Sequence, residues 1–329
     1  MENTKDQALT SAELSQLWQT YMGDTSQICV LSYFANTVEN SDIKSNIEFA
    51  LDRASGHVDF IANMFKADGH EVPKGFSVTE DVDVNAPRIF SDDFMLEFLH
   101  QFARIGLRVH ALNLSLAVRK DCTSLFKQCV EDSVKLYEAT RDLLLEKGLF
   151  IRSPYLQSAH KVDFIQHQNF LTGFFGDKRP LLAPEVTNLY ANFQRNALGT
   201  ATMLGFMQTA ESEDVIKYIT RGKEIAEKHC EVFNSFLGEN DLPASLYWDS
   251  QVTENTHRVF SDKLMMFMTA SLTNNGIAFY GLGVGSSLRK DLGVMYNRLI
   301  AEIQMYGEDG ANIMIDHGWL ESPPKAKDL

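Results

Sequence analysis

The chain has 329 residues, of which 44% are hydrophobic, and this suits a globular protein of about two domains. Its formal net charge of −14 argues against nucleic acid or an anionic membrane surface as the main partner. The four cysteines form no Cys-x-x-Cys pair, and the N-terminus is polar and acidic, unlike a signal peptide. We therefore expect a cytoplasmic protein with buried, reduced thiols.

Four long helices are predicted in the first half of the chain. Apolar residues recur at helical spacing, and prolines cluster between the periodic segments. The expected helices span 11–39, 42–67, 92–118 and 121–147. Their connections are short, long and short, so the helices run up, down, down and up. This pattern predicts an all-α, ferritin-like four-helix bundle with a long crossover between its second and third helices.

The crossover ends in Arg-Ile-Phe-Ser-Asp, residues 88–92. Ser91 can accept a hydrogen bond from an early backbone N–H of the next helix, and Asp92 places negative charge at the positive helix end. Phe90 stands where a hydrophobic residue packs back onto the first turn. The motif therefore predicts the start of the third helix.

The second half of the chain repeats the first. Arg-Val-Phe-Ser-Asp at 258–262 matches 88–92 at an offset of 170, and further matches extend the alignment in both directions. The repeat is domain-sized, so we predict two tandem bundles, residues 9–154 and 182–324. One irregular array of eight helices is the alternative. The joining segment 155–181 is rich in phenylalanine and is expected to pack across both bundles.

Residues 264–288 carry no charge, and a helix of this length could span a bilayer. Their counterparts, residues 94–118, include charged side chains, and one fold must serve both copies. We therefore expect no membrane span but an enclosed helix, between the bundles or in a dimer interface. Gly281 and Gly285, four residues apart, would allow another helix to approach closely.

Di-iron proteins of the ferritin type need Glu-x-x-His on two helices of a bundle. The helical match here is Glu97 with His100, and the second copy has Phe267 and Ala270 at these positions. The chain also shows no phosphate loop, nucleophile elbow or dinucleotide fingerprint. The sequence thus leaves catalysis open but favours a protein that is not an enzyme.

A weaker constellation surrounds the inward-facing His57. Counting along antiparallel helices places Asp24 and Asp132 at the same height, with His110 within one turn. Imidazole and carboxylate groups could together hold one divalent metal ion: iron, zinc or manganese. The favoured alternative is a buried histidine that is hydrogen-bonded by a neighbouring acid and ties the helices together.

The second copy offers a weaker version of this set. His229 corresponds to His57, and Glu302 lies nearby, but Asn196 and Tyr280 replace Asp24 and His110. If a metal binds, the first copy is therefore expected to hold it.

Several motifs carry a resemblance to a known family: the duplicated unit with Arg-x-Phe-Ser-Asp, Gly-Asp-Lys-Arg-Pro-Leu at 176–181, and EDGANIMIDHGWLE at 308–321. Over nearly its whole length the chain resembles a domain-of-unknown-function family of endospore-forming bacteria. Its members often carry two tandem copies, and some are labelled as spore coat proteins. The resemblance implies a ferritin-like helical fold and spore association. It brings no established activity and hence no catalytic residue.

Three functions are consistent with these features. The first is a non-enzymatic structural protein of sporulation or stress, which self-associates and has spore-coat or stress-related partners. The second is a metal-binding or small redox protein that uses the residues around His57 and His229. The third is a binder of a small apolar ligand, within or between the bundles, which requires a ligand-sized internal cavity.

Overall fold

The computed structural model describes residues 8–157, 162–174, 178–243 and 247–326. Over these residues the secondary structure is helical, apart from two isolated β-bridges. The expected all-α fold is therefore confirmed. The helix ends lie within about two residues of those expected from the periodicity, as is usual for helix boundaries.

The first half forms four long helices with one short helix in the crossover. In chain order they are α1 (Ser11–Thr37), α2 (Ser41–Ala67), α3 (Val78–Asp81), α4 (Asp92–Leu116) and α5 (Lys120–Glu146). The second half repeats the pattern with two short 3₁₀ turns. Its elements are η2 (Gln168–Leu171), α6 (Ala183–Thr209), α7 (Glu213–Gly238), η3 (Asp249–Gln251), α8 (Asp262–Ser286) and α9 (Lys290–Asp316).

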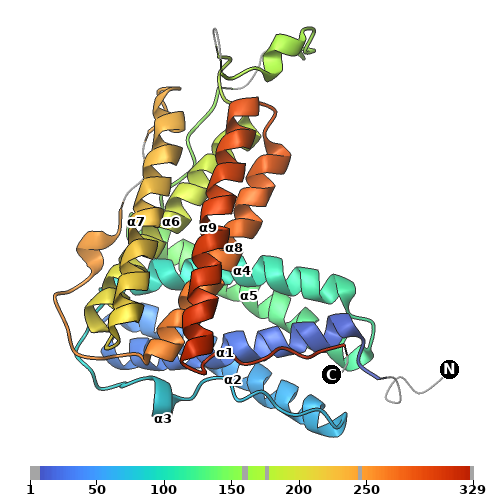
Figure 1. Ribbon diagram of the computed structural model, residues 1–329, viewed down its shortest axis with the longest axis vertical. Helices are drawn as coiled ribbons and strands as arrows, with labels where there is room; N and C mark the ends of the chain where they lie inside the picture. The colour runs from blue at the N-terminus through green and yellow to red at the C-terminus, as the bar shows by residue number, and fades with distance from the viewer. Residues whose placement is uncertain (1–7, 158–161, 175–177, 244–246, 327–329) are drawn as a thin grey trace.

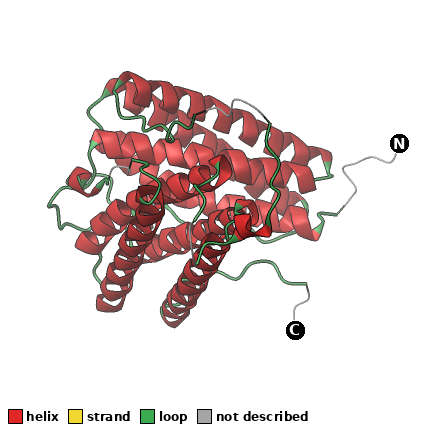
Figure 2. Ribbon diagram, turned by 90° about the horizontal axis from the view of Figure 1, so that it is seen from above, coloured by secondary structure: helices red, strands yellow, loops and turns green. Residues whose placement is uncertain are grey.

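Each half packs its helices in the same pairs. Helix α1 lies against α2, α4 against α5, and α2 against α5, while α6 to α9 form the corresponding contacts of the second half. The helices of the first half run across those of the second (Figure 1). Seen from above, the two sets keep clearly different directions (Figure 2). The halves meet directly, at α4 and α6 and at their crossovers.

The repeated Arg-x-Phe-Ser-Asp motif starts α4 and α8 as predicted and also joins the halves. Ser91 and Ser261 each cap their helix by accepting the backbone N–H three residues on. The Ser91 hydroxyl also donates to Gln251 Oε1 at 2.6 Å, and the Ser261 hydroxyl donates to Asp81 Oδ1 at 2.7 Å. Gln251 and Asp81 lie in the opposite crossovers. One motif therefore fixes helix starts and the contact between copies.

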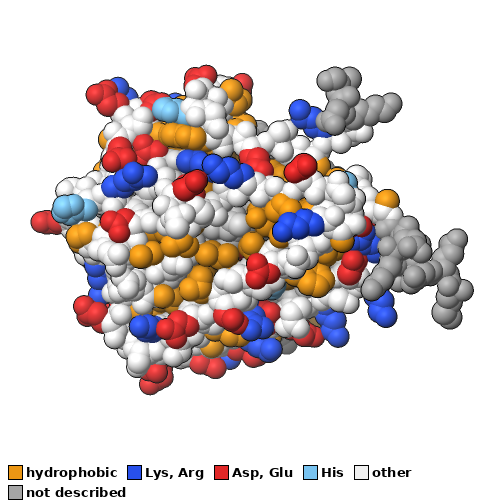
Figure 3. Space-filling model, turned by 90° about the horizontal axis from the view of Figure 1, so that it is seen from below, with side chains coloured by type: hydrophobic (Ala, Val, Ile, Leu, Met, Phe, Trp, Pro, Cys, Tyr) orange, Lys and Arg blue, Asp and Glu red, His pale blue; other side chains and the backbone are white. Residues whose placement is uncertain are grey.

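The joining segment does not behave as expected. In its described part, Tyr155 is 86% exposed and Phe164 is 78% exposed. The segment extends away from the bundles at the top of Figure 1. The expectation that it packs across both bundles is wrong for these residues. The end of the segment packs on the second bundle, where Arg179 pairs with Glu185 and Leu181 is buried. Figure 3 shows a further band of hydrophobic side chains on the opposite, lower face of the molecule.

Helix α8 packs through a different glycine from the expected ones. Nothing lies within 4 Å of a side chain added at Gly281 or Gly285, whereas Gly283 lies directly against the ring of Tyr296. The close approach expected at Gly281 and Gly285 is therefore wrong, because the packed face of the helix contains Gly283. None of the described helices combines the length and apolar character needed to span a bilayer.

Candidate functional site

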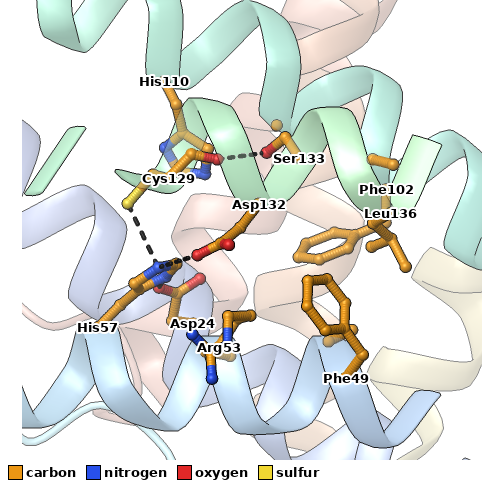
Figure 4. A pocket seen from close by; sticks show the side chains of 14 residues that line it. Asp24, Phe49, Arg53, His57, Phe102, His110, Cys129, Asp132, Ser133 and Leu136 are labelled. Carbon is orange, nitrogen blue, oxygen red and sulfur yellow. Dashed lines mark hydrogen bonds and ion pairs between the residues drawn. The ribbon is translucent and has the colours of Figure 1, made fainter. Parts of the chain in front are cut away.

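The structure brings together the residues predicted around His57. The His57 Nδ1 atom lies 3.1 Å from Asp24 Oδ2, and its Nε2 atom lies 3.8 Å from Asp132 Oδ2 (Figure 4). The Cys129 sulfur lies 3.5 Å from Nε2, and the His110 ring centroid lies 6.4 Å from that of His57. We call these five residues the His57 layer. They come from α1, α2, α4 and α5 and meet inside the first bundle.

Two acids set the charge of the His57 layer. Burial alone would lower the pKa of His57, but the hydrogen bond and charge of Asp24, with the charge of Asp132, raise it above its usual value. Burial lowers the pKa of His110. The layer therefore favours an imidazolium held between two carboxylates, beside a neutral second imidazole.

The His57 layer has unused polar atoms. His110 Nδ1 and Asp132 Oδ2 are buried and have no hydrogen-bond partner among the described residues. Both residues border a hollow of about 40 Å³, enough for one water molecule or one small ion. In the part of the chain that the structure describes, no three His, Cys, Asp or Glu side chains converge so as to hold a metal ion.

The second bundle has a more neutral version. His229 Nδ1 lies 2.9 Å from the Tyr280 hydroxyl, and Nε2 lies 3.2 Å from Glu302 Oε2. The Asn196 amide donates to the Tyr280 hydroxyl at 2.9 Å. Burial lowers the pKa of His229, and Glu302, which also pairs with Lys228, offsets only part of this effect. The two copies thus keep the histidine but differ in charge.

Glu97 and His100, the helical Glu-x-x-His match, take separate partners. Glu97 Oε1 accepts from Gln101 at 2.7 Å, and burial raises the pKa of Glu97 to about 7. His100 Nδ1 lies 3.1 Å from the Thr140 hydroxyl, and burial lowers its pKa to about 4. The pair therefore serves the core of the first bundle.

A larger space lies between the bundles. This inter-bundle cavity measures about 630 Å³ and is bounded by α1, α4, α6, α7, α8 and α9. Exposed Gln19 and Asn274 line its edge, so it opens to solvent. Much of the remaining wall is apolar or aromatic. Large side chains in this wall are Trp18, Phe98, Phe102, Phe267, Leu272 and Phe279.

Residues next to His57 and residues next to His229 both line the cavity. Asp24 and His110 belong to the His57 layer and also line the cavity. In the second bundle, Asn196 and Tyr280 line the cavity and connect to His229. The half-buried His57 and the buried His229 are therefore each one residue away from the space between the bundles. Periodicity within one copy could not show this space, since its wall combines helices from both.

Comparisons with known proteins agree with the duplication. The family described as "Protein of unknown function (DUF3231)" matches residues 1–162 and, a second time, residues 169–329. A search of curated proteins finds no match. A crystal structure of a "putative spore coat protein" from Bacillus halodurans C-125 is similar at 20% identity and a TM-score of 0.42, over 48% of this chain and 100% of that chain. Because the two family matches cover nearly every residue, the chain belongs to the DUF3231 family and carries its domain twice in tandem.

Proposed function

We propose that this protein binds a small molecule with a largely apolar body in the inter-bundle cavity. The cavity volume of about 630 Å³ carries the proposal, because pockets for small ligands measure about 300–1,000 Å³. The cavity opens to solvent, so its apolar wall faces water. An apolar ligand would remove this wall from water, which is favourable. Binding of a small apolar ligand requires a ligand-sized cavity, and the size of this cavity supports the proposal.

A neutral fluorescent probe tests the proposal. N-phenyl-1-naphthylamine, titrated into the full chain, should brighten and saturate as it enters an apolar site. Gly199→Leu should weaken this binding, because Gly199 lines the cavity and a side chain there meets no atom within 4 Å. Gly281→Leu is the matched control, since Gly281 is equally unobstructed but lies outside the cavity wall. Equal binding by wild type and Gly199→Leu would overturn the proposal.

A metal ion in the His57 layer is a second candidate, which requires the side chains to move closer together, because no three potential ligands converge among the described residues. The unbonded atoms His110 Nδ1 and Asp132 Oδ2, beside a hollow of about 40 Å³, favour it. A divalent ion would compete with protons for His57, because a metal ligand must be the neutral imidazole. Elemental analysis of untagged protein should then give one metal per chain, lost in His57→Ala but kept in His229→Ala. Metal-free wild type would exclude this function.

We infer that the two bundles, residues 9–154 and 182–324, are each ferritin-like. The long crossovers between second and third helices support this, as does the pairing of α2 with α5. A structural role in sporulation or stress, in the cytoplasm or the spore, stays a prediction from the sequence resemblance. Self-association also stays a prediction, and the exposed side chains of Phe164 and Ile165 favour it. Light scattering behind size-exclusion chromatography would show oligomers, and a monomer at every concentration would contradict them.

A further inference from the structure

Three arginines gather at one part of the cavity wall. Arg195, on α6, lines the cavity itself. Arg108, on α4, donates to Asn275 Oδ1 at 3.0 Å, and Arg104 donates to Gln101 Oε1 at 3.3 Å. Asn275 and Gln101 both line the cavity, so the first bundle brings two cations to the wall where the second bundle supplies a third.

Phe279 holds two of these cations close together. The Arg195 Cζ atom lies 3.4 Å from the centroid of the Phe279 ring, and the Arg108 Cζ atom lies 3.7 Å from it. Attraction to the ring partly offsets the repulsion between the two guanidinium groups. The ring also forms part of the cavity wall. The charge is therefore fixed next to the apolar space rather than directed away from it.

The arginines lack carboxylate partners. Among the described residues, none of the three forms an ion pair with Asp or Glu, although the chain contains 44 acidic residues. Burial, together with the charges of Arg104 and Arg108, lowers the pKa of Arg195 to about 9. Positive charges that are close together and partly removed from water are costly unless an anion joins them.

Nearby acids do not fill this role. Asp24 is the acid in the cavity wall, and its Oδ2 atom is engaged with His57 Nδ1. Glu97 reaches Arg104 through Gln101, and burial raises the pKa of Glu97 to about 7, outweighing the charge of Arg104, which lowers it. Glu97 therefore offsets part of the charge of Arg104 and, among the described residues, forms no ion pair with the other two arginines. The cationic part of the wall is thus left for a charge from outside the chain.

Building on the proposed ligand site, we propose that the natural ligand is an anionic amphiphile, whose charged head binds Arg195 and whose apolar body fills the inter-bundle cavity. A guanidinium group offers two parallel N–H donors that match a carboxylate. Arg195 uses Nη1 for Asn192 Oδ1, at 3.1 Å, and has further donors to offer. The aromatic wall next to it suits a hydrocarbon chain.

The duplication gives this site one orientation. The repeat places Gly23 at the position of Arg195 and Val109 at that of Phe279. Gly23 is followed by Asp24, which would repel an anion. The head group is therefore expected on the Arg195 side of the cavity only. Divergence of the two copies created this difference between their sides.

Displacement of N-phenyl-1-naphthylamine from the full chain tests the inference. Dodecanoate and dodecan-1-ol share a hydrocarbon body and differ in charge. Wild type should bind dodecanoate more tightly than dodecanol. Arg195→Gln should lose at least about tenfold in dodecanoate affinity and leave dodecanol unchanged. Arg221→Gln is the control, because that arginine also contacts an aromatic ring but is exposed and paired with Asp309.

The outcomes separate the two proposals. Failure of the probe to bind wild type would overturn the ligand site and this inference together. Probe binding with equal displacement by dodecanoate and dodecanol would overturn the inference alone. Arg195→Lys, which keeps the charge but loses the paired donors, covers the case in which Arg195→Gln does not fold. It should weaken dodecanoate selectively, and unchanged affinity would count against recognition by the guanidinium.

Discussion

Single carboxylates hold the start of each bundle together. Glu13 Oε1 accepts the backbone N–H groups of Val118 and Arg119, at 2.9 and 2.7 Å, and its other oxygen accepts from Thr10. Glu185 repeats the arrangement in the second copy with Leu288 and Arg289. In both bundles, one buried acid therefore joins the first helix to the connection before the fourth. The repeat at this position reflects backbone hydrogen bonding rather than catalysis.

The pKa of Glu13 makes this role measurable. Burial alone would raise it, but the N–H groups of Arg119, Thr10 and Val118 outweigh burial and lower it to about 2. Because the folded pKa lies below the unfolded value of 4.5, the stabilisation is complete above pH 4.5 and is lost as pH falls towards 2. Glu13→Gln should lower the free energy of unfolding by about 1–3 kcal/mol at pH 7. This loss relative to wild type should shrink as the pH falls from 4.5 to about 2.

Urea unfolding at a series of pH values would measure the effect. Glu138→Gln is the control, since Glu138 is an exposed helical carboxylate. A constant difference between wild type and Glu13→Gln from pH 7 to pH 2 would contradict the assignment.

Helices α7 and α9 are joined by a reciprocal pair of tyrosines. The rings of Tyr218 and Tyr306 stack at 4.2 Å, and each hydroxyl donates to the backbone carbonyl of the other residue, at 3.1 and 3.2 Å. Gly222 and Gly310, four residues after each tyrosine, leave room for the opposite hydroxyl. Larger residues at the glycine positions would force the helices apart.

Gly310→Ala should therefore lower stability by about 1–3 kcal/mol, because its methyl group would overlap the Tyr218 hydroxyl. Gly293→Ala, in the same helix but with nothing within 4 Å, should be neutral or stabilising by up to about 1 kcal/mol. Thermal unfolding followed by circular dichroism would compare them. Tyr218→Ala removes both the hydroxyl and the ring carbon that would overlap the added methyl group, so it should cost less stability in Gly310→Ala than in wild type. Equal costs in the two backgrounds would exclude the overlap as the cause.

Sequence reasoning succeeded where the signal is local. Helical periodicity placed the long helices, and counting along antiparallel pairs brought Asp24, His57 and Asp132 together. It failed for Gly281 and Gly285, because spacing alone does not show which face of a helix is packed. It left open whether a cavity lies within or between the bundles, because this depends on how the two copies cross. One signal was available: Arg195 occupies the position in the second copy that Gly23 occupies in the first, an unusual exchange for a half-buried position.

The motif phenylalanines, Phe90 and Phe260, each pack against both bundles. Phe260, from the second copy, packs edge-on against Tyr33 of α1, with ring centroids 5.4 Å apart. Gly205 of α6 corresponds to Tyr33 in the repeat. It lies so close to Phe90 that a Cβ atom added to it would be 2.6 Å from the Phe90 ring. Phe90 in turn belongs to the first copy. Each bundle thus completes its core with a residue of the other.

A shared core predicts that the bundles unfold together, because neither can open without exposing the phenylalanine of its neighbour. Two variants, one retaining Trp18 and the other Trp248 as the single tryptophan, report on the first and second copies. Their unfolding midpoints in urea should coincide. Phe260→Ala should lower both midpoints together, at a cost of about 3–5 kcal/mol, whereas Leu282→Ala, at an exposed site, should change neither. A shift seen by Trp248 alone would mean that the copies fold independently, and the cavity between them would then be a hinge rather than a fixed site.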